Sequence, residues 1–536
     1  MTDNETPTAA AAPAAPAPAP APAPTMDLSD IGNARAFARQ ARDSLLWMPQ
    51  DKRWWCYDAS AGTWSPDLSC VAMATAIKTA EALAALAERQ SDEPTETPQP
   101  DGSVKTGPSR RVHARRWAAR SRSSDRLAAM IKWARAEPKM HAVYEDFDRD
   151  DYKLSVQGGQ LVDLRTGKAR ATEPRDRVTK QAGAPWLPLA ECRRWDRFLR
   201  EVAPPIPDKP DPPAPNATRA TVDAYAADLQ AVERARADQR QWIDYIQRAV
   251  GASLIGAQRD ALLLFLHGRG SNGKTTFLET VADVLGSYAV QTMPDLLMVT
   301  RNERHTSELV DLMGARMAIS TETKQRGVFD EGKIKRMTGG GKITGARKSK
   351  DSVTFRAKFT MWVDGNSDPR VSGQDDGIWR RIKKLPWLAH FRGSDDPRQE
   401  HSHDKDPHLL ATLQAEHAGI LRWAIAGARL YLSDGLTAPQ VVIDATTDYK
   451  ATQDELQHML DTVAIELSAG RVETRELYEA LVAAYESEGY KPPTARTLYA
   501  QLRDKGYALK PSNAKRFWHG LQLKPATDRP ARAVYS

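Results

Sequence analysis

One segment of this 536-residue chain constrains its fold more than any other: an apolar run that leads directly into a glycine-rich loop. Residues 261–267 read Ala-Leu-Leu-Leu-Phe-Leu-His, which is typical of a buried β-strand. Residues 268–275 then follow the pattern Gly-x-x-x-x-Gly-Lys-Thr, and residues 276–285 have the apolar spacing of a helix. This order of strand, loop and helix predicts an α/β fold with a parallel sheet.

The loop has the residue types that hold a nucleotide. Its glycines allow consecutive backbone N–H groups to turn toward a phosphate, Lys274 can reach the β and γ oxygens, and the hydroxyl of Thr275 can bind Mg²⁺. The alternative is a chance glycine-rich turn, which the flanking strand and helix disfavour. The sequence therefore predicts a site for ATP and Mg²⁺ made of Gly268, Arg269, Gly270, Ser271, Asn272, Gly273, Lys274, Thr275 and Thr276.

Polar residues follow two further strand-like runs. Glu322 ends the first run, where a carboxylate can hold Mg²⁺ together with Thr275 and polarise the attacking water, although it could also be a solvated acid. Asn366 follows the second run and could sense the γ-phosphate from the same edge of the sheet. Arg380 and Arg381 are either surface ion-pair residues or an arginine finger for a neighbour's phosphate.

Positive charge is concentrated in one segment. The whole chain has 76 Lys and Arg against 69 Asp and Glu, whereas residues 333–358 hold nine basic residues and one acid, a local net charge of +8. Such a density favours contact with a nucleic-acid backbone over a merely solvated face. The residues singled out for this contact are Lys342, Arg347, Lys348 and Lys350.

Two other basic segments leave alternatives open. The last helical pattern contains Arg496 and Arg503, and the aromatic segment after it contains Lys515 and Arg516; together they could dock on duplex DNA or on a partner protein. Residues 110–126 contain seven arginines, which could form a DNA-entry collar or a solvated face.

The periodicity also predicts individual elements outside the loop region. We expect a helix over 34–47, strands over 53–57 and 63–64 around the turn at Gly62, and a surface loop over 91–108. Further helices are expected over 127–136, 218–240, 455–467, 474–488 and 494–505.

The predicted domain order has six parts. They are an Ala/Pro tail (1–25), an N-terminal α+β domain (26–203), a proline-rich linker with a connecting helix (204–240), an ATPase core (241–400), a helical connector (401–452) and a C-terminal DNA-binding domain (453–536).

Several classes of protein are disfavoured. The three cysteines lack the spacing of a disulfide framework or a zinc site, and no apolar run reaches the ~20 residues of a membrane span. The tail begins with acids and lacks the basic start of a secretory signal, so a cytoplasmic location is expected, in the bacterial host if the chain is phage-encoded. The acidic run at Asp146, Asp148 and Asp150 is interpreted as a charged turn rather than as the metal pair of a primase.

The motif order resembles superfamily 3 helicases of the phage and plasmid primase-helicase type, which are related to the poxvirus primase-helicase. The resemblance rests on residues 268–275, Glu322, the basic turn at 335–347, Asn366 and the arginine pair. Residues 51–67, 159–167 and 177–180 resemble the helicase-associated N-terminal domain of that family, and residues 506–520 its winged-helix tail.

This resemblance implies an AAA+ ring, usually a hexamer, that hydrolyses ATP between subunits and pulls single-stranded DNA through its pore. By analogy Asn366 is sensor 1, Arg380 or Arg381 acts in trans, and Lys342 and Arg347 lie on a pore hairpin. The expected partners are single-stranded and forked DNA, further copies of the chain and a separate primase or polymerase. Two alternatives remain: an origin-binding initiator that switches assembly state without unwinding, and a P-loop kinase or phosphotransferase.

Overall fold

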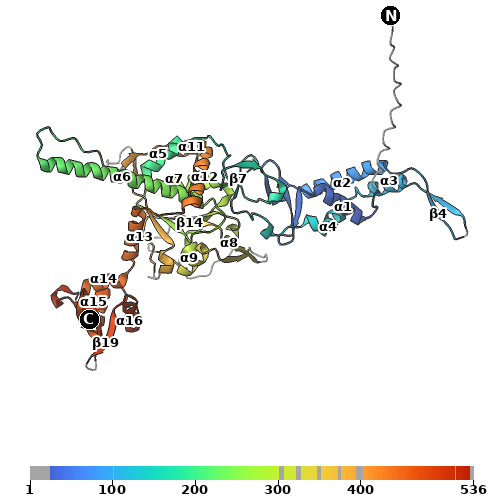
Figure 1. Cartoon of the computed structure of the whole chain (residues 1–536). Coiled ribbons are helices and arrows are strands. Elements are labelled where there is room, and N and C mark those ends of the chain that lie inside the picture. Colours follow the sequence, from blue (N-terminus) through green and yellow to red (C-terminus); the bar gives the residue numbers. More distant parts are fainter. Residues whose placement is uncertain are drawn as a thin grey trace, which may run out of the picture. The chain divides into compact units, whose positions relative to one another are not determined.

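The computed structural model describes residues 25–100, 102–300, 307–321, 327–346, 352–371, 376–393, 402–512 and 515–530 (Figure 1). The contacts divide the chain into two compact units. Unit 1 comprises residues 1–149 and 173–179, and unit 2 comprises residues 150–172 and 180–536. Part of the segment 26–203 therefore packs with unit 2, because strands from 150–172 bury their apolar side chains in the core of that unit.

Unit 1 contains a small helical layer and a three-stranded antiparallel sheet in the order β1-β2-β3. Phe37 on the first helix and Trp54 on the second strand pack edge to face in its core. The helices are α1 (Asp30–Ala41), α2 (Val71–Glu88), α3 (Arg110–Arg120) and α4 (Ser124–Ala134); the strands are β1 (Leu45–Met48), β2 (Arg53–Asp58), β3 (Thr63–Pro66), β4 (Thr95–Pro98) and β5 (Val104–Gly107).

Two expectations for unit 1 are confirmed and two need correction. The strand–turn–strand around Gly62 is present as β2 and β3, and Gly62 has a φ of 71°. The helix expected over 127–136 is α4. The helix expected over 34–47 ends at Ala41, because the following residues pair with β2 as a third strand. The expected loop over 91–108 contains the antiparallel hairpin β4–β5.

Asp146 and Asp148, the acids of this run that belong to unit 1, lie in a tight turn, as expected. The Asp148 carboxylate accepts hydrogen bonds from the amide, at 2.9 Å, and from the hydroxyl of Thr179. Asp146 pairs with Arg149 at 2.6 Å and with Arg177 at 3.2 Å. The carboxylates thus hold the turn together. Over the described part of the chain, no three His, Cys, Asp or Glu side chains gather as metal ligands would.

Unit 2 is built on a five-stranded sheet in the order β10-β11-β14-β9-β15, with every neighbouring pair parallel. The predicted α/β fold with a parallel sheet is therefore confirmed. Its strands are β9 (Leu263–His267), β10 (Ala289–Thr292), β11 (Met317–Ser320), β14 (Thr360–Gly365) and β15 (Ile382–Pro386).

Helices cover both faces of this sheet, which explains the continuous apolar run in β9. Leu264 and Leu266 pack into a cluster with the helices of one face, whereas Leu263 and Phe265 pack into the cluster of the other. The first face carries α5 (Arg193–Val202), α6 (Arg219–Ala252), α7 (Lys274–Leu285), α11 (Leu409–Ala415) and α12 (His417–Asp434); the second carries α9 (Glu331–Thr338), α10 (Asp376–Trp379) and α13 (Gln440–Thr452).

Helices α6 and α12 cross with their backbones in contact. A Cβ atom on Gly251 would lie 2.1 Å from the Ala428 nitrogen, and a Cβ atom on Gly427 would lie 2.1 Å from the Gln247 carbonyl oxygen. Both distances are far below a van der Waals contact, so the crossing requires glycine on each helix. Helix α6 extends to Ala252, twelve residues beyond the end expected from the sequence.

Smaller elements complete this part of unit 2. The antiparallel strands β6 (Lys153–Val156), β7 (Gln160–Asp163) and β8 (Ala169–Ala171) bury Leu154, Val156 and Val162 in the first core cluster. A second antiparallel pair, β12 (Lys342–Ala346) and β13 (Ser352–Arg356), follows α9. The remaining elements are α8 (Ser307–Asp311) and the parallel pair β16 (His390–Arg392) and β17 (Ser402–Asp404).

The C-terminal part of unit 2 has its own core, centred on the fully buried Trp518. It contains α14 (Glu455–Val463), α15 (Thr474–Ser487) and α16 (Ala495–Asp504) with an antiparallel sheet in the order β18-β20-β19. The strands are β18 (Ala464–Glu473), β19 (Ala508–Ser512) and β20 (Lys515–Leu523). The helix expected over 455–467 ends at Val463, because the next residues pair with β20. No helix in the described residues has the length and hydropathy that a membrane crossing requires.

Candidate functional site

The glycine-rich loop lies between β9 and α7, and its shape is fixed by close packing. Gly273 has a φ of 85°, and a Cβ atom there would lie 3.1 Å from side-chain atoms of Phe198 and Val202. A Cβ atom on Gly268 would lie 2.2 Å from the Trp387 carbonyl oxygen. The Phe391 amide donates to the Ser271 carbonyl at 2.7 Å. Side chains larger than hydrogen would therefore displace the loop.

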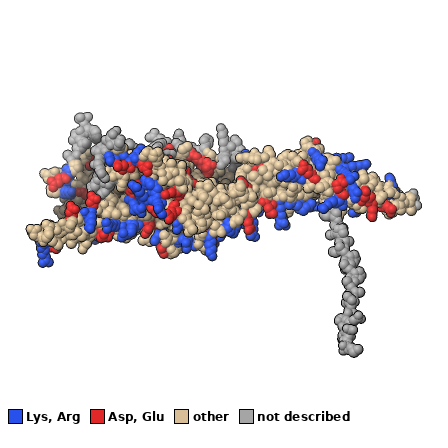
Figure 2. Space-filling model, turned by 90° about the horizontal axis from the view of Figure 1, so that it is seen from above, with Lys and Arg blue, Asp and Glu red and all other residues tan. Residues whose placement is uncertain are grey.

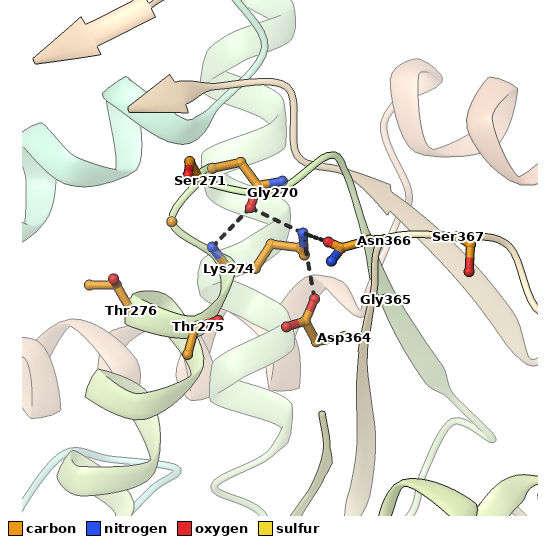
Figure 3. Close-up of a pocket in the computed structure, with 11 residues that line it drawn as sticks. Gly270, Ser271, Lys274, Thr275, Thr276, Asp364, Gly365, Asn366 and Ser367 are labelled. Atoms are coloured by element: carbon orange, nitrogen blue, oxygen red, sulfur yellow. Dashed lines mark hydrogen bonds and ion pairs between the residues drawn. The ribbon is translucent and has the colours of Figure 1, made fainter. Parts of the chain in front are cut away.

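Lys274, the first residue of α7, points back into this loop and is 3% exposed (Figure 3). Its Nζ donates to the Gly268 carbonyl at 2.8 Å, to Asn366 Oδ1 at 3.0 Å and to Asn272 Oδ1 at 3.1 Å. The Asp364 carboxylate lies 3.6 Å away. Burial lowers the pKa of Lys274 from its usual value, and the charge of Asp364 opposes that shift.

A cavity of about 500 Å³ opens in front of Lys274. Lys274, Thr275 and Thr276 at the start of α7 lie along it, and the N-terminus of a helix favours negative charge. The cavity is therefore suited to an anion the size of a polyphosphate. The residues that line it are Gly270, Ser271, Asn272, Gly273, Lys274, Thr275, Thr276, Asp364, Gly365, Asn366 and Ser367.

Most residues expected from the glycine-rich motif line this cavity, and two do not. Arg269 is exposed and is absent from the lining, and Gly268 contributes its carbonyl to Lys274 instead. Asn366 was expected at the same edge of the sheet and contacts the lysine directly. Glu322 lies outside the described residues; β11, which precedes it, ends at Ser320 next to β14.

Sequence reasoning missed Asp364. It lies in β14, which pairs with β9 so that Asp364 is level with Leu266 and Gly365 with His267. This register brings an 8% exposed carboxylate to the lysine. An acid at the end of a buried strand, two residues before Asn366, was the available signal.

Arg380 and Arg381 differ in exposure and in contacts. Arg380 is exposed, and its side chain forms no hydrogen bond or ion pair with the described residues. Arg381 is half-buried, and its guanidinium donates to the Gly377 carbonyl. Its own carbonyl accepts from the Leu263 amide at 2.8 Å, so Arg381 ties the turn after α10 to the sheet.

The basic segment 333–358 is less positive than its composition indicates. Lys333 and Lys335 face the acids of their own helix, Asp330 at 3.8 Å and Glu331 at 3.6 Å. Lys358 pairs at 2.6 Å with an acid far away in the sequence, Asp151. Including the two acids just before the window lowers the net charge from +8 to +6.

The hairpin β12–β13 is the exposed part of this segment. Lys342 is the first residue of β12 and is exposed, as is Arg356 at the end of β13. The other residues singled out here, Arg347, Lys348 and Lys350, lie outside the described residues.

Basic residues of the C-terminal part occupy the expected elements. Arg496 and Arg503 are exposed on α16, and their spacing of seven residues places them on one face. Arg516 is exposed on β20, and Lys515 pairs with Glu473 at 2.6 Å. Lys505 instead pairs with Asp454 and supports the fold.

Comparisons with known proteins identify two matching families. Residues 34–204 match a domain described as D5 N terminal like, and residues 266–381 match a family of unknown function, DUF5906. The second match spans the glycine-rich loop, β14 and the arginine pair.

The similar curated proteins are from large DNA viruses. "Putative helicase L207/L206" of Acanthamoeba polyphaga mimivirus is 26% identical over 277 residues, 48% of this chain and 29% of that protein. "Putative primase C962R" of African swine fever virus (isolate Tick/Malawi/Lil 20-1/1983) is 29% identical over 177 residues, 32% of this chain and 18% of that protein. "Putative helicase 022R" of Frog virus 3 is 26% identical over 154 residues, 27% of this chain and 16% of that protein.

The chain spans less than a third of the length of each of these relatives. Among solved structures, the C-terminal region of NrS-1 matches with a TM-score of 0.33 and 10% identity over 60% of this chain and 77% of that chain. The family matches and the viral relatives point in the same direction: residues 34–204 match the D5 N terminal like domain, and the chain is similar to viral proteins named as putative helicases and primases.

Proposed function

We propose that the chain is an ATP-dependent DNA helicase of phage or plasmid replication, with an AAA+ core that acts as a ring, expected to be a hexamer. The observation that carries the proposal is the arrangement around Lys274, a buried ammonium group at the mouth of a cavity formed by a glycine-rich loop and the end of β14. Two viral relatives are named as helicases, which supports the same class of activity.

The site residues fit a nucleotide with Mg²⁺. The neutral oxygens that now surround Lys274 Nζ are weak partners compared with phosphate oxygens, so the ammonium group can exchange them for a charged ligand. Thr275, at the start of α7, would offer its hydroxyl to Mg²⁺, and Glu322 would polarise water. Asn366 would sense the γ-phosphate, because it already contacts the lysine that reaches for that group.

Three surfaces would contact other molecules. Arg380 is the better candidate for the finger in trans, because its side chain is exposed whereas that of Arg381 is bound within its own subunit. Lys342 and the basic residues after β12 would contact single-stranded DNA in the pore. The C-terminal part contains three helices and a three-stranded sheet, which are the elements of a winged helix. Such a domain would place Arg496 and Arg503 on duplex DNA.

A strand-separation assay tests the proposed function. The purified chain with ATP and Mg²⁺ is expected to release the labelled strand of a forked DNA, and to hydrolyse ATP faster when DNA is present. A matched sample without ATP is the control. Hydrolysis that leaves the strands paired would contradict unwinding and indicate an assembly switch, whereas hydrolysis indifferent to DNA would indicate a small-substrate phosphotransferase.

Removing the Asp364 carboxylate is expected to change the pH dependence of ATP hydrolysis. Its negative charge opposes the lowering of the pKa of Lys274, so Asp364→Asn lowers that pKa further. The charged lysine is then lost at lower pH, and the alkaline limb of kcat/KM for ATP is expected to move to lower pH. Below that limb the variant retains the charged lysine.

Asp444→Asn is the matched control for this prediction. Asp444 is an exposed carboxylate on α13 that accepts a hydrogen bond from Gln440, and its loss should leave the alkaline limb in place. An Asp364→Asn profile with an unmoved alkaline limb would show that the carboxylate does not act through Lys274.

A further inference from the structure

The arginines at 110–126 are sorted into two groups by their contacts. Seven arginines and a single acid, Asp125, lie in this segment of unit 1. Figure 2 shows basic and acidic side chains interspersed over the face that it views, so charge balance within a patch depends on which arginines have acidic neighbours.

Three of the arginines have structural partners. Arg111 pairs with Asp92 at 3.1 Å, and Arg115 forms an ion pair with Glu88 at the end of α2. Arg126 pairs with Asp30, and its guanidinium lies 4.7 Å from the centre of the Trp117 ring. These three arginines hold α3 and α4 against their neighbours, and their charges are balanced.

The other four arginines are exposed and form no ion pair with any residue that the structure describes. We call these residues the outer arginines: Arg110, Arg116, Arg120 and Arg122. Arg116 and Arg120 lie one turn apart on α3. Each is two residues, or about 200° of rotation, from the buried Ala118, so both point away from the packed face of the helix. Three of these positive charges thus lie on α3 and the fourth, Arg122, lies in the turn between α3 and α4, with Asp125 as the single acid of residues 110–126.

The geometry of the outer arginines fits a regular polyanion. Helix α3 has 11 residues, which is a length of about 16 Å at 1.5 Å per residue. One strand of duplex DNA carries a phosphate about every 3.4 Å along its axis, so the helix spans about five phosphates.

Helix α3 has no free tryptophan, tyrosine or phenylalanine ring on which an unpaired base could stack. Its one aromatic residue, Trp117, is half-buried, donates its indole N–H to Asn33 Oδ1 at 3.0 Å and is covered by Arg126. Asn33 is itself fully buried and donates to Ser121 at 2.9 Å. Proteins that bind single strands combine positive charge with free aromatic faces, which Trp117 does not offer.

We propose that the outer arginines, on α3 and in the turn that follows it, form a contact surface for the phosphate backbone of duplex DNA, independent of base sequence. This surface lies in unit 1 and goes beyond the proposed function, which rests on the cavity in unit 2. Arginine contributes charge-assisted hydrogen bonds to phosphate oxygens and positions the duplex without reading it.

The test measures duplex binding by the full chain without nucleotide. The triple variant Arg116→Gln, Arg120→Gln and Arg122→Gln is compared with the wild type by anisotropy of a labelled duplex over a range of salt concentrations. Each lost phosphate contact lowers the slope of log K against log salt by about 0.9, so the triple variant is expected to lower it by about two to three and to weaken binding at low salt.

Two further variants separate a phosphate contact from a general loss of charge or of fold. The matched control is Arg39→Gln, Arg42→Gln and Arg53→Gln, which removes the same charge from exposed arginines elsewhere in unit 1 and should change the slope by less than about one. The triple Arg→Lys variant at positions 116, 120 and 122 keeps the charge and should retain most of the wild-type slope.

Three results would overturn the proposal: a slope equal to that of the wild type, a loss no larger than that of the matched control, or a loss seen with an unpaired oligonucleotide but not with the duplex. DNA-free ATP hydrolysis of the Gln triple variant should equal that of the wild type. If the proposed function fails, the failure will appear as absent hydrolysis or unwinding in the wild type, and the titration of duplex will still report on α3.

Discussion

Lys274→Ala is expected to abolish ATP hydrolysis, with a loss of kcat of at least about 10²- to 10³-fold. Among the described residues that line the cavity, Lys274 has the one positive side chain, and its Nζ is held by three oxygens that fix its position. Without it, charge that develops on the transferred phosphate loses a buried donor. The measurement is steady-state release of phosphate with and without DNA.

The change also leaves a nearly buried carboxylate without the ammonium group beside it, so stability must be separated from chemistry. The double variant Lys274→Ala with Asp364→Asn removes the remaining charge and should recover thermal stability while staying inactive. Lys78→Ala, on the exposed side of α2, should behave as the wild type. Hydrolysis at the wild-type rate in a folded Lys274→Ala protein would mean that the cavity is not the site of phosphoryl transfer.

Arg380→Ala is expected to have the second large effect, because an arginine finger contributes about 10³- to 10⁵-fold to turnover. If the finger acts on the neighbouring subunit, adding variant subunits to wild type should lower hydrolysis more steeply than their fraction in the mixture. The measurement is the rate at constant total protein over a series of mixing ratios. A rate that falls in simple proportion would exclude action across a subunit boundary.

Arg381→Ala is the natural comparison for this experiment. Its guanidinium donates to the Gly377 carbonyl, so Arg381→Ala should lower the melting temperature. In mixtures with wild-type subunits, it should lower the rate of hydrolysis only in proportion to its fraction. A steep loss in mixtures with Arg381→Ala, and a proportional loss with Arg380→Ala, would reverse the assignment of the two arginines.

The centre of the candidate site could be predicted because its signal is local. The strand, the glycine-rich loop and the helix are consecutive in the chain, and each restricts the conformation of the next. Asn366 could be placed because the end of an apolar strand is visible in the sequence. Asp364 lies at the same strand end, but its approach to Lys274 depends on the register of β14 with β9, which sequence spacing does not determine.

The net charge of the basic segment 333–358 could not be predicted as well as the candidate site, because ion pairs depend on tertiary contacts. Lys358 pairs with a residue 207 positions away, which no window of sequence could include. Lys333 and Lys335 have partners only a few residues away, but just outside the window in which charge was counted. Likewise, residues after Val463 have a helical pattern, and their pairing with the distant β20 makes them a strand. Tertiary contacts override local propensity at each of these positions.

The crossing of α6 and α12 has a consequence for how related chains can be recognised. At Gly251 and Gly427 the space for a side chain is occupied by the backbone of the opposite helix, so no substitution can be accommodated without moving the two helices apart. Any homologue that keeps this pair of helices in register must then have glycine at both equivalent positions, however far its remaining sequence has diverged. Glycine at both of the positions equivalent to Gly251 and Gly427 is thus a marker by which this pair of helices can be recognised in chains whose overall sequence identity has fallen below detection.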